Sequence, residues 1–115
     1  MGDGWGGPPT AGMFVRSWSA RATPEGVESY RRHFENELLP RLRAVAGQRG
    51  ALLLRRGLGP EAELVVLTFW DSMDAIRAFA GTEPTKAMVA PEARAVLVDY
   101  DREVRILEVL LDARA

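Results

Sequence analysis

Short apolar runs along the chain predict four β-strands. They cover residues 13–20, 50–56, 62–70 and 103–111. The first run alternates loosely and places Phe14, Arg16 and Trp18 on one face. The second and third runs flank a turn rich in glycine and proline, which is typical of a β-hairpin.

Apolar residues spaced by three or four predict a long helix between the first two strands. Thr23 suits the N-cap and Pro24 the first turn. An apolar stripe then continues from Val27 to Val45, and Gly47 is a natural stop. Pro40 should kink this helix or split off its last turns, because proline lacks the backbone N–H of a helical residue.

A second helix is predicted after the third strand. Asp71 is its expected N-cap, and Gly81 its end. Further helical turns are expected within residues 82–89 and from Pro91 to Val98.

The predicted order β-α-β-β-α-β indicates an α+β, ferredoxin-like domain with a four-stranded antiparallel sheet. The domain is expected to span residues 13–112. Residues 1–12 (MGDGWGGPPTAG) are expected to form a flexible Gly/Pro-rich leader.

The predicted strands are apolar on both faces, although helices should cover only one face of such a sheet. In the third strand, Val65, Leu67 and Phe69 share one face, while Leu64 and Val66 share the other. A second copy of the same sheet is the simplest cover, because most oligomers are symmetric homodimers. The alternative is that the extra helical turns before the last strand cap the second face.

Composition narrows the classes of function. The chain has 115 residues, a formal net charge of -1 and no cysteine. The charge gives no support to nucleic acid or an anionic membrane surface as a partner. The absence of cysteine excludes disulfides, thiolate nucleophiles and cysteine metal sites. Because His33 is the sole histidine, a multi-histidine metal site within one chain is excluded as well. No apolar run reaches the roughly 18 residues of a membrane span, and no signal peptide is recognisable. A cytoplasmic location is therefore expected.

Several short stretches resemble the antibiotic biosynthesis monooxygenase-like family. They are Arg16–Trp18, Ala46–Gly50, Leu67–Ser72, Ala75–Gly81, Pro91–Ala95 and Glu108–Leu110. The resemblance implies a dimeric α/β barrel with one pocket per subunit between sheet and helices. Branches of that family include cofactor-independent oxygenases of polycyclic aromatic polyketides and heme-degrading enzymes.

Residue-by-residue transfer from that family is incomplete. Relatives often carry a His-Tyr-Glu-Val run where this chain has Ile106–Val109. Members of the heme-degrading branch carry a triad of asparagine, tryptophan and histidine. Phe79 and Val89 match the last two, and the first strand has no asparagine. Heme degradation by that route is therefore not expected.

Three residues are the expected catalytic groups. Arg16 could stabilise a phenolate or carboxylate, unless it forms a salt bridge with Glu108. His33 could act as a general base, or could be a helix-flank residue. Trp70 could stack on a flat substrate, or could be a core residue.

Four further residues are expected to contact the substrate, namely Trp18, Tyr30, Thr68 and Phe79. Packing in the core is the alternative role for Trp18 and Tyr30. No metal and no cofactor is expected.

The sequence therefore predicts a homodimeric, monooxygenase-like protein that acts on a planar aromatic small molecule without a cofactor. One alternative is a non-catalytic dimer that binds a hydrophobic small molecule or serves as a structural unit. Another is a heme-binding protein, for which His33 is the only conventional axial ligand.

Overall fold

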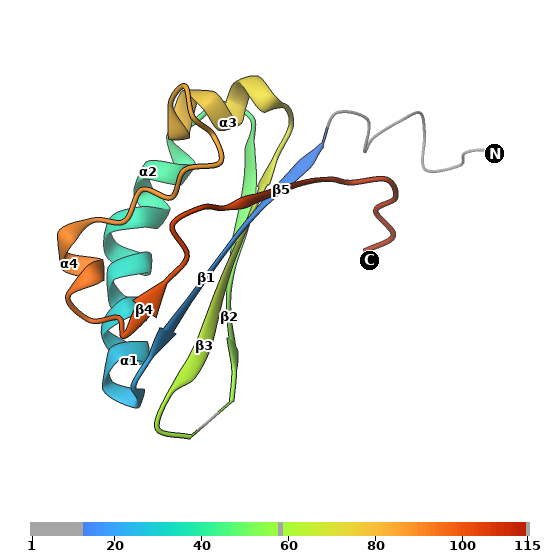
Figure 1. The fold of residues 1–115 in the computed structure, drawn as a ribbon. Helices are drawn as coiled ribbons and strands as arrows, with labels where there is room; N and C mark the ends of the chain where they lie inside the picture. Colours follow the sequence, from blue (N-terminus) through green and yellow to red (C-terminus); the bar gives the residue numbers. More distant parts are fainter. Residues whose placement is uncertain (1–12, 58, 115) are drawn as a thin grey trace.

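The computed structural model describes residues 13–57 and 59–114, so the expected leader 1–12 lies outside the described residues (Figure 1). The elements are β1 (Phe14–Ala22), α1 (Pro24–His33), the π-helical turn η1 (Phe34–Leu38), α2 (Leu39–Arg43), β2 (Gln48–Arg56), β3 (Ala62–Trp70), α3 (Met73–Ala80), α4 (Pro91–Arg94), β4 (Asp99–Tyr100) and β5 (Arg105–Glu108). No helix in these two ranges is long and apolar enough to cross a membrane.

The strands form one antiparallel sheet in the order β2-β3-β1-β4, and β5 also pairs with β1. This arrangement confirms the predicted α+β, ferredoxin-like fold. The predicted last strand is instead two short strands along one edge of β1. From Tyr100 to Arg105 the chain takes five steps, whereas β1 takes three from Ala20 to Ser17. Those additional residues bulge out of the ladder and interrupt the strand.

Side-chain caps define where the helices begin. The Thr23 hydroxyl accepts a hydrogen bond from the Gly26 N–H at 3.1 Å, which confirms the predicted start of α1. The prediction that Asp71 caps α3 is wrong. Ser72 is the N-cap, and its hydroxyl accepts from the Ala75 N–H at 3.1 Å. Asp71 instead pairs with Arg49, whose hydrogen bonds lower the pKa of that carboxyl group.

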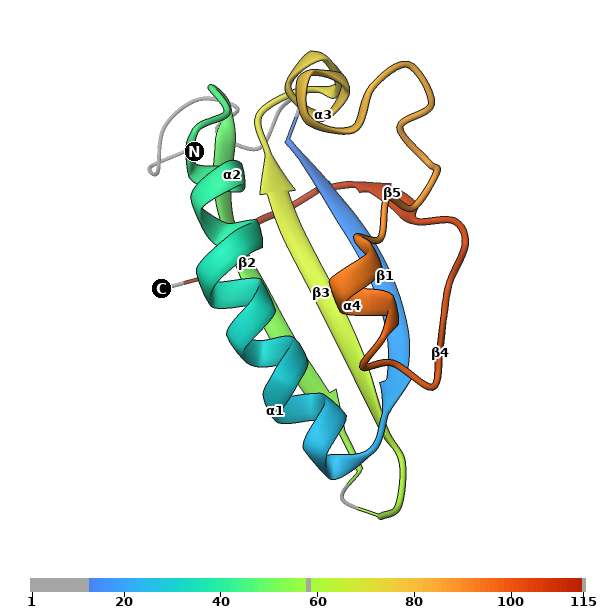
Figure 2. The same ribbon diagram turned by 90° about the vertical axis from the view of Figure 1, so that its left-hand side faces the viewer.

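Pro40 lies in the first turn of α2, directly after a π-helical turn. The Leu39 N–H donates to the carbonyl of Phe34, five residues earlier. This wider turn is where the helix adjusts to a proline that has no N–H to donate. The predicted break is therefore present, although the two helical pieces continue in the same direction (Figure 2).

The expected helical turn within residues 82–89 is wrong. Residues 82–90, here called the wall segment, run mostly without regular structure beside the chain before β5. The Val104 N–H donates to the Thr85 carbonyl at 2.7 Å, and the Ala87 N–H donates to the Arg102 carbonyl at 2.9 Å. Pairing with residues 102–104 satisfies backbone groups that a helix would otherwise have used.

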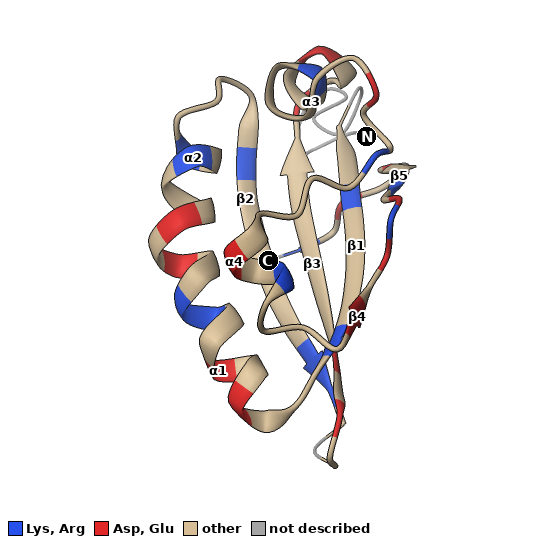
Figure 3. Cartoon of the chain, turned by 60° about the vertical axis from the view of Figure 1, so that its left-hand side comes forward, with Lys and Arg blue, Asp and Glu red and all other residues tan. Residues whose placement is uncertain are grey.

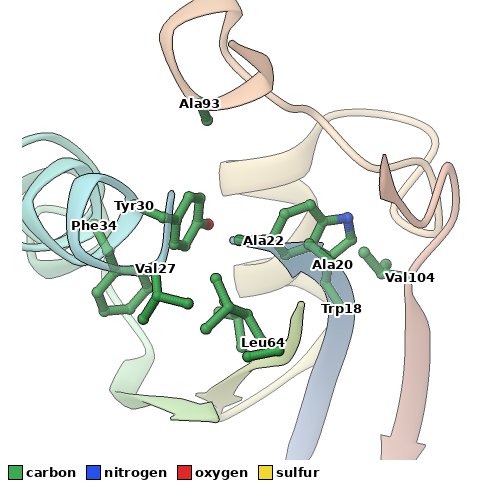
Figure 4. Packing of buried hydrophobic residues seen from close by; sticks show 11 residues of the cluster. Trp18, Ala20, Ala22, Val27, Tyr30, Phe34, Leu64, Ala93 and Val104 are labelled. Carbon is green, nitrogen blue, oxygen red and sulfur yellow. The ribbon is translucent and has the colours of Figure 1, made fainter. Parts of the chain in front are cut away.

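Helices α1, α2 and α4 cover one face of the sheet (Figures 1 and 2). The main core lies between them and the strands, where Trp18, Tyr30, Phe34 and Leu64 are buried together (Figure 4). A second cluster holds Trp70 against α2 and α3. Figure 3 shows charges of both signs along the helical stretch from α1 through η1 to α2, whereas most of β3 is uncharged.

The other face of the sheet, here called the open face, is not covered by any helix of the described chain. Leu52, Leu54 and Leu107 are 47%, 42% and 50% exposed there. The expected alternative cover is absent, because α4 packs on the helix side (Figure 2). The described chain covers this face only near its C-terminal end, where the Arg114 guanidinium lies 4.7 Å from the centre of the Phe69 ring.

Gly26→Ala is expected to lower the free energy of unfolding by about 1–3 kcal/mol. A Cβ at this position would lie 2.4 Å from the carbonyl oxygen of Val96, a backbone atom that cannot easily move away. This clash should exceed the gain of about 1 kcal/mol that alanine normally brings inside a helix. Urea denaturation of the variant measures the loss. Ser29→Ala in the same helix is the control, and a Gly26→Ala protein as stable as the parent would contradict the clash.

Candidate functional site

A cavity of about 80 Å³ lies between the helix-covered face of the sheet and the wall segment. Strands β1 and β3 supply its floor, and α1, η1 and α2 supply one side. Its lining is Arg16, Trp18, Tyr30, His33, Leu38, Arg41, Leu42, Val66, Thr68, Phe79, Ala87, Met88, Val89, Ala90, Ala93 and Val104. Six of the seven residues predicted from the sequence to form a site therefore surround one space, and Trp70 is the exception.

Arg16 extends from near the start of β1 toward the wall segment. Its Nε donates to the carbonyl of Pro84 and its Nη2 to that of Lys86, each at 3.0 Å. The expected salt bridge to Glu108 is not formed, because Glu108 is placed opposite Phe14, two residues away along β1. Burial lowers the pKa of the Arg16 guanidinium, which shows a cation taken partly out of water.

Aromatic side chains form part of the cavity wall. The Trp18 indole N–H donates to the Asp101 carbonyl at 2.8 Å, and the Trp18 ring lies 5.9 Å from that of Tyr30. Burial raises the pKa of Tyr30 far above its ordinary value, so its phenol stays protonated and can donate a hydrogen bond. The half-buried His33 ring lies 5.8 Å from Tyr30.

Trp70 does not reach the cavity. It is completely buried, its indole N–H donates to the Thr68 hydroxyl at 2.8 Å, and its ring lies 5.5 Å from Phe79. Thr68 and Phe79 both line the cavity, so Trp70 supports two lining residues from behind. In this geometry the indole is a positioning residue, and a ligand in the cavity cannot stack on it directly.

Arg41 lines the cavity, although it is not among the site residues predicted from the sequence. Its guanidinium lies 5.6 Å from the centre of the Phe79 ring, at the side of the cavity. The available signal was its position three residues after Leu38, which puts both on one side of the helix. The cavity therefore holds two arginines and one histidine.

The candidate site offers few ligands for a metal. Within residues 13–57 and 59–114, no group of three or more His, Cys, Asp or Glu side chains could hold a metal ion. His33 is a single imidazole at the cavity, which is the minimum that a heme iron requires.

Residues 13–91 match the model of the family described as antibiotic biosynthesis monooxygenase. The match spans more than half of the chain, and the chain belongs to this family. No curated protein matches the sequence at a significant level.

Solved structures show the same fold at low sequence identity. A candidate antibiotic biosynthesis monooxygenase from Bacillus cereus is 16% identical, with a TM-score of 0.64 over 90% of this chain and 98% of that one. Rv0793 from Mycobacterium tuberculosis is 21% identical, with a TM-score of 0.60 over 89% and 99%. The heme-degrading protein Rv3592 from the same organism, heme free, is 22% identical, with a TM-score of 0.55 over 89% and 99%.

Proposed function

We propose that this chain is an oxygenase-type enzyme that oxidises a planar, electron-rich aromatic small molecule in this cavity. One observation carries the proposal: the cation of Arg16, the imidazole of His33 and the protonated phenol of Tyr30 all line one partly apolar space. Charge stabilisation, a proton acceptor and a hydrogen-bond donor are the groups that such an oxidation needs.

The reaction that suits these groups is the conversion of a CH2 between aromatic rings to a C=O. His33 accepts one proton of the CH2, and Arg16 stabilises the resulting anion. The anion transfers electrons to O2, a C–O bond forms, and the O–O bond then breaks. One oxygen atom stays on the substrate and the other leaves in water together with both hydrogens. The substrate supplies all four electrons, so no further reductant enters the balance.

The cavity must enlarge before such a substrate fits. Drug-sized ligands occupy pockets of about 300–1,000 Å³, whereas this cavity measures about 80 Å³. The wall segment is the part that can move most easily, because it has almost no regular structure and few backbone hydrogen bonds, and Met88 is 65% exposed. Displacement of this segment would open the space above Arg16.

Oxygen uptake with 1,8-dihydroxyanthrone as the probe tests the activity. We expect uptake above the rate in buffer, with a matching rise in quinone absorbance. Arg16→Gln should lower kcat/KM by roughly 100-fold, the typical cost of losing one group that stabilises a developing anion. Arg43→Gln is the control, because Arg43 is an exposed residue of α2 outside the cavity. Uptake at the buffer rate would refute turnover of this probe class.

The same proposal includes a homodimer closed over the open face. Three leucines 42–50% exposed on one sheet face are an unusual surface for a monomer. A second copy would cover them with the same apolar surface through a two-fold axis. Light scattering should then give twice the chain mass of 12.7 kDa.

Binding without turnover is the second candidate function, favoured by the many aliphatic side chains in the lining. It predicts saturable binding of the anthrone probe with no oxygen uptake above buffer. Heme binding through His33 is distinguished from these two functions by titration with hemin, which would give the visible absorbance of a bound heme. His33→Ala should abolish that spectrum.

A further inference from the structure

Arg16 is a half-buried cation with no carboxylate partner in the described part of the chain. Its hydrogen-bond partners there are two neutral carbonyl oxygens, of Pro84 and Lys86. Taking a charge out of water without an opposite charge is costly, and neutral dipoles offset that cost only in part. An anion that reaches Arg16 would therefore bind more strongly than either carbonyl.

The lining holds a second arginine and no acidic residue. Arg41 shares the cavity with Arg16, and no aspartate or glutamate is among its lining residues. Elsewhere on the described surface seven arginines pair with carboxylates, among them Arg49 with Asp71 and Arg56 with Glu63. The cavity therefore concentrates positive charge that the fold itself leaves uncompensated.

We infer that the cavity selects an aromatic ligand that carries a preformed carboxylate, and that this carboxylate replaces the carbonyls of Pro84 and Lys86 on Arg16. The inference rests on the site of the proposed function and adds the charge of its ligand. It also makes Arg16 the latch of the wall segment, because the guanidinium holds two of that segment's carbonyls while the cavity is empty.

The exchange explains how a cavity of about 80 Å³ admits a larger molecule. A carboxylate can accept two parallel hydrogen bonds from one guanidinium, so it substitutes for both carbonyls at once. Once released, the wall segment keeps its backbone bonds to residues 102–104, its turn contacts and the packing of Ala87 and Val89 against the core. A neutral ligand of the same shape makes weaker hydrogen bonds to the guanidinium, so it displaces the two carbonyls less readily.

Two isosteric probes test the charge selectivity. By calorimetry, 1-naphthoate should bind at least tenfold more tightly than 1-naphthamide, since hydrogen bonds between charged groups are markedly stronger than neutral ones. Arg16→Gln should reduce this ratio to near one, and Arg16→Lys should retain part of it. Arg43→Gln, which removes the same charge outside the cavity, should keep the full ratio. Equal affinities, or binding of neither probe by the parent protein, would overturn the inference.

The chain provides a direct reporter of the latch, because Lys86 is its only lysine. A lysine-specific endoprotease can cut only the Lys86–Ala87 bond, whose carbonyl accepts from Arg16. We expect slow cutting in the free protein, several-fold faster cutting with saturating 1-naphthoate, and equally fast cutting of Arg16→Gln without ligand. Naphthoate that binds and leaves the cutting rate unchanged would refute the exchange of partners.

These results separate from those of the proposed function. A protein that prefers naphthoate through Arg16 and shows no oxygen uptake would support the inference and contradict the oxygenase. A protein that oxidises the anthrone probe and binds both naphthalenes equally would support the oxygenase and contradict the inference.

Discussion

Trp70→Ala should lower the free energy of unfolding by about 3–5 kcal/mol, the usual cost of truncating a buried tryptophan. The side chain has no exposed surface and packs in the cluster that joins the end of β3 to α2 and α3. Its loss leaves a large cavity and removes the hydrogen bond to Thr68. Since the total free energy of unfolding of a small domain is only about 5–15 kcal/mol, this variant should be close to unfolding at room temperature.

Urea denaturation followed by far-ultraviolet circular dichroism measures this loss. Trp70→Phe keeps an aromatic ring but loses the N–H donor, so it should cost less than the alanine variant. Leu110→Ala is the matched surface control, because Leu110 is 84% exposed and should change stability by less than about 0.5 kcal/mol. If the free energy of unfolding of Trp70→Ala lies within 1 kcal/mol of that of the parent, which is close to the error of such measurements, the conclusion that this ring is fully buried is wrong.

Leu52→Glu should convert the proposed dimer to a monomer. A two-fold interface would bury the new carboxylate twice, each time without an opposite charge, which is strongly unfavourable. The isolated chain should tolerate it, because Leu52 is already 47% exposed there. The mass from light scattering should fall from twice 12.7 kDa to 12.7 kDa, while the circular dichroism spectrum stays unchanged.

Val98→Glu is the matched control for the dimer. Val98 is also 47% exposed, but it precedes β4 in a bend and is not part of a strand of the sheet. This variant should keep the mass of the parent protein. A dimer that survives Leu52→Glu would place the interface elsewhere, and a parent protein that is monomeric would leave the exposed leucines uncovered.

The elements with strong local signals could be predicted from the sequence. Thr23 and Pro24 predict the start of α1, and the observed cap has the expected hydrogen bond. The apolar run 62–70 coincides with β3 (Ala62–Trp70). The cap of α3 was misplaced by one residue, because Asp71 and Ser72 both suit an N-cap and only the partner Arg49 decides between them.

The wall segment could not be predicted by local patterns. Its backbone partners are the carbonyl of Arg102 and the N–H of Val104, both distant in sequence. The same holds for Arg16, whose contacts at Pro84 and Lys86 lie about seventy residues away. A helical turn was expected at 82–89 because nothing in the sequence of that stretch indicates that it pairs with residues 102–104.

By itself the sequence determined the main strands and helices, the family, and six of the sixteen residues that line the cavity. Periodicity and capping are local properties, and alternation in β1 and β3 places side chains on one face of the sheet whatever lies opposite. Only the tertiary structure decided that Trp70 stands behind Thr68, that Arg41 joins the cavity, and that Arg16 contacts carbonyls instead of Glu108. Those outcomes depend on register and on which distant segment closes the cavity, and these are set by packing of the whole chain.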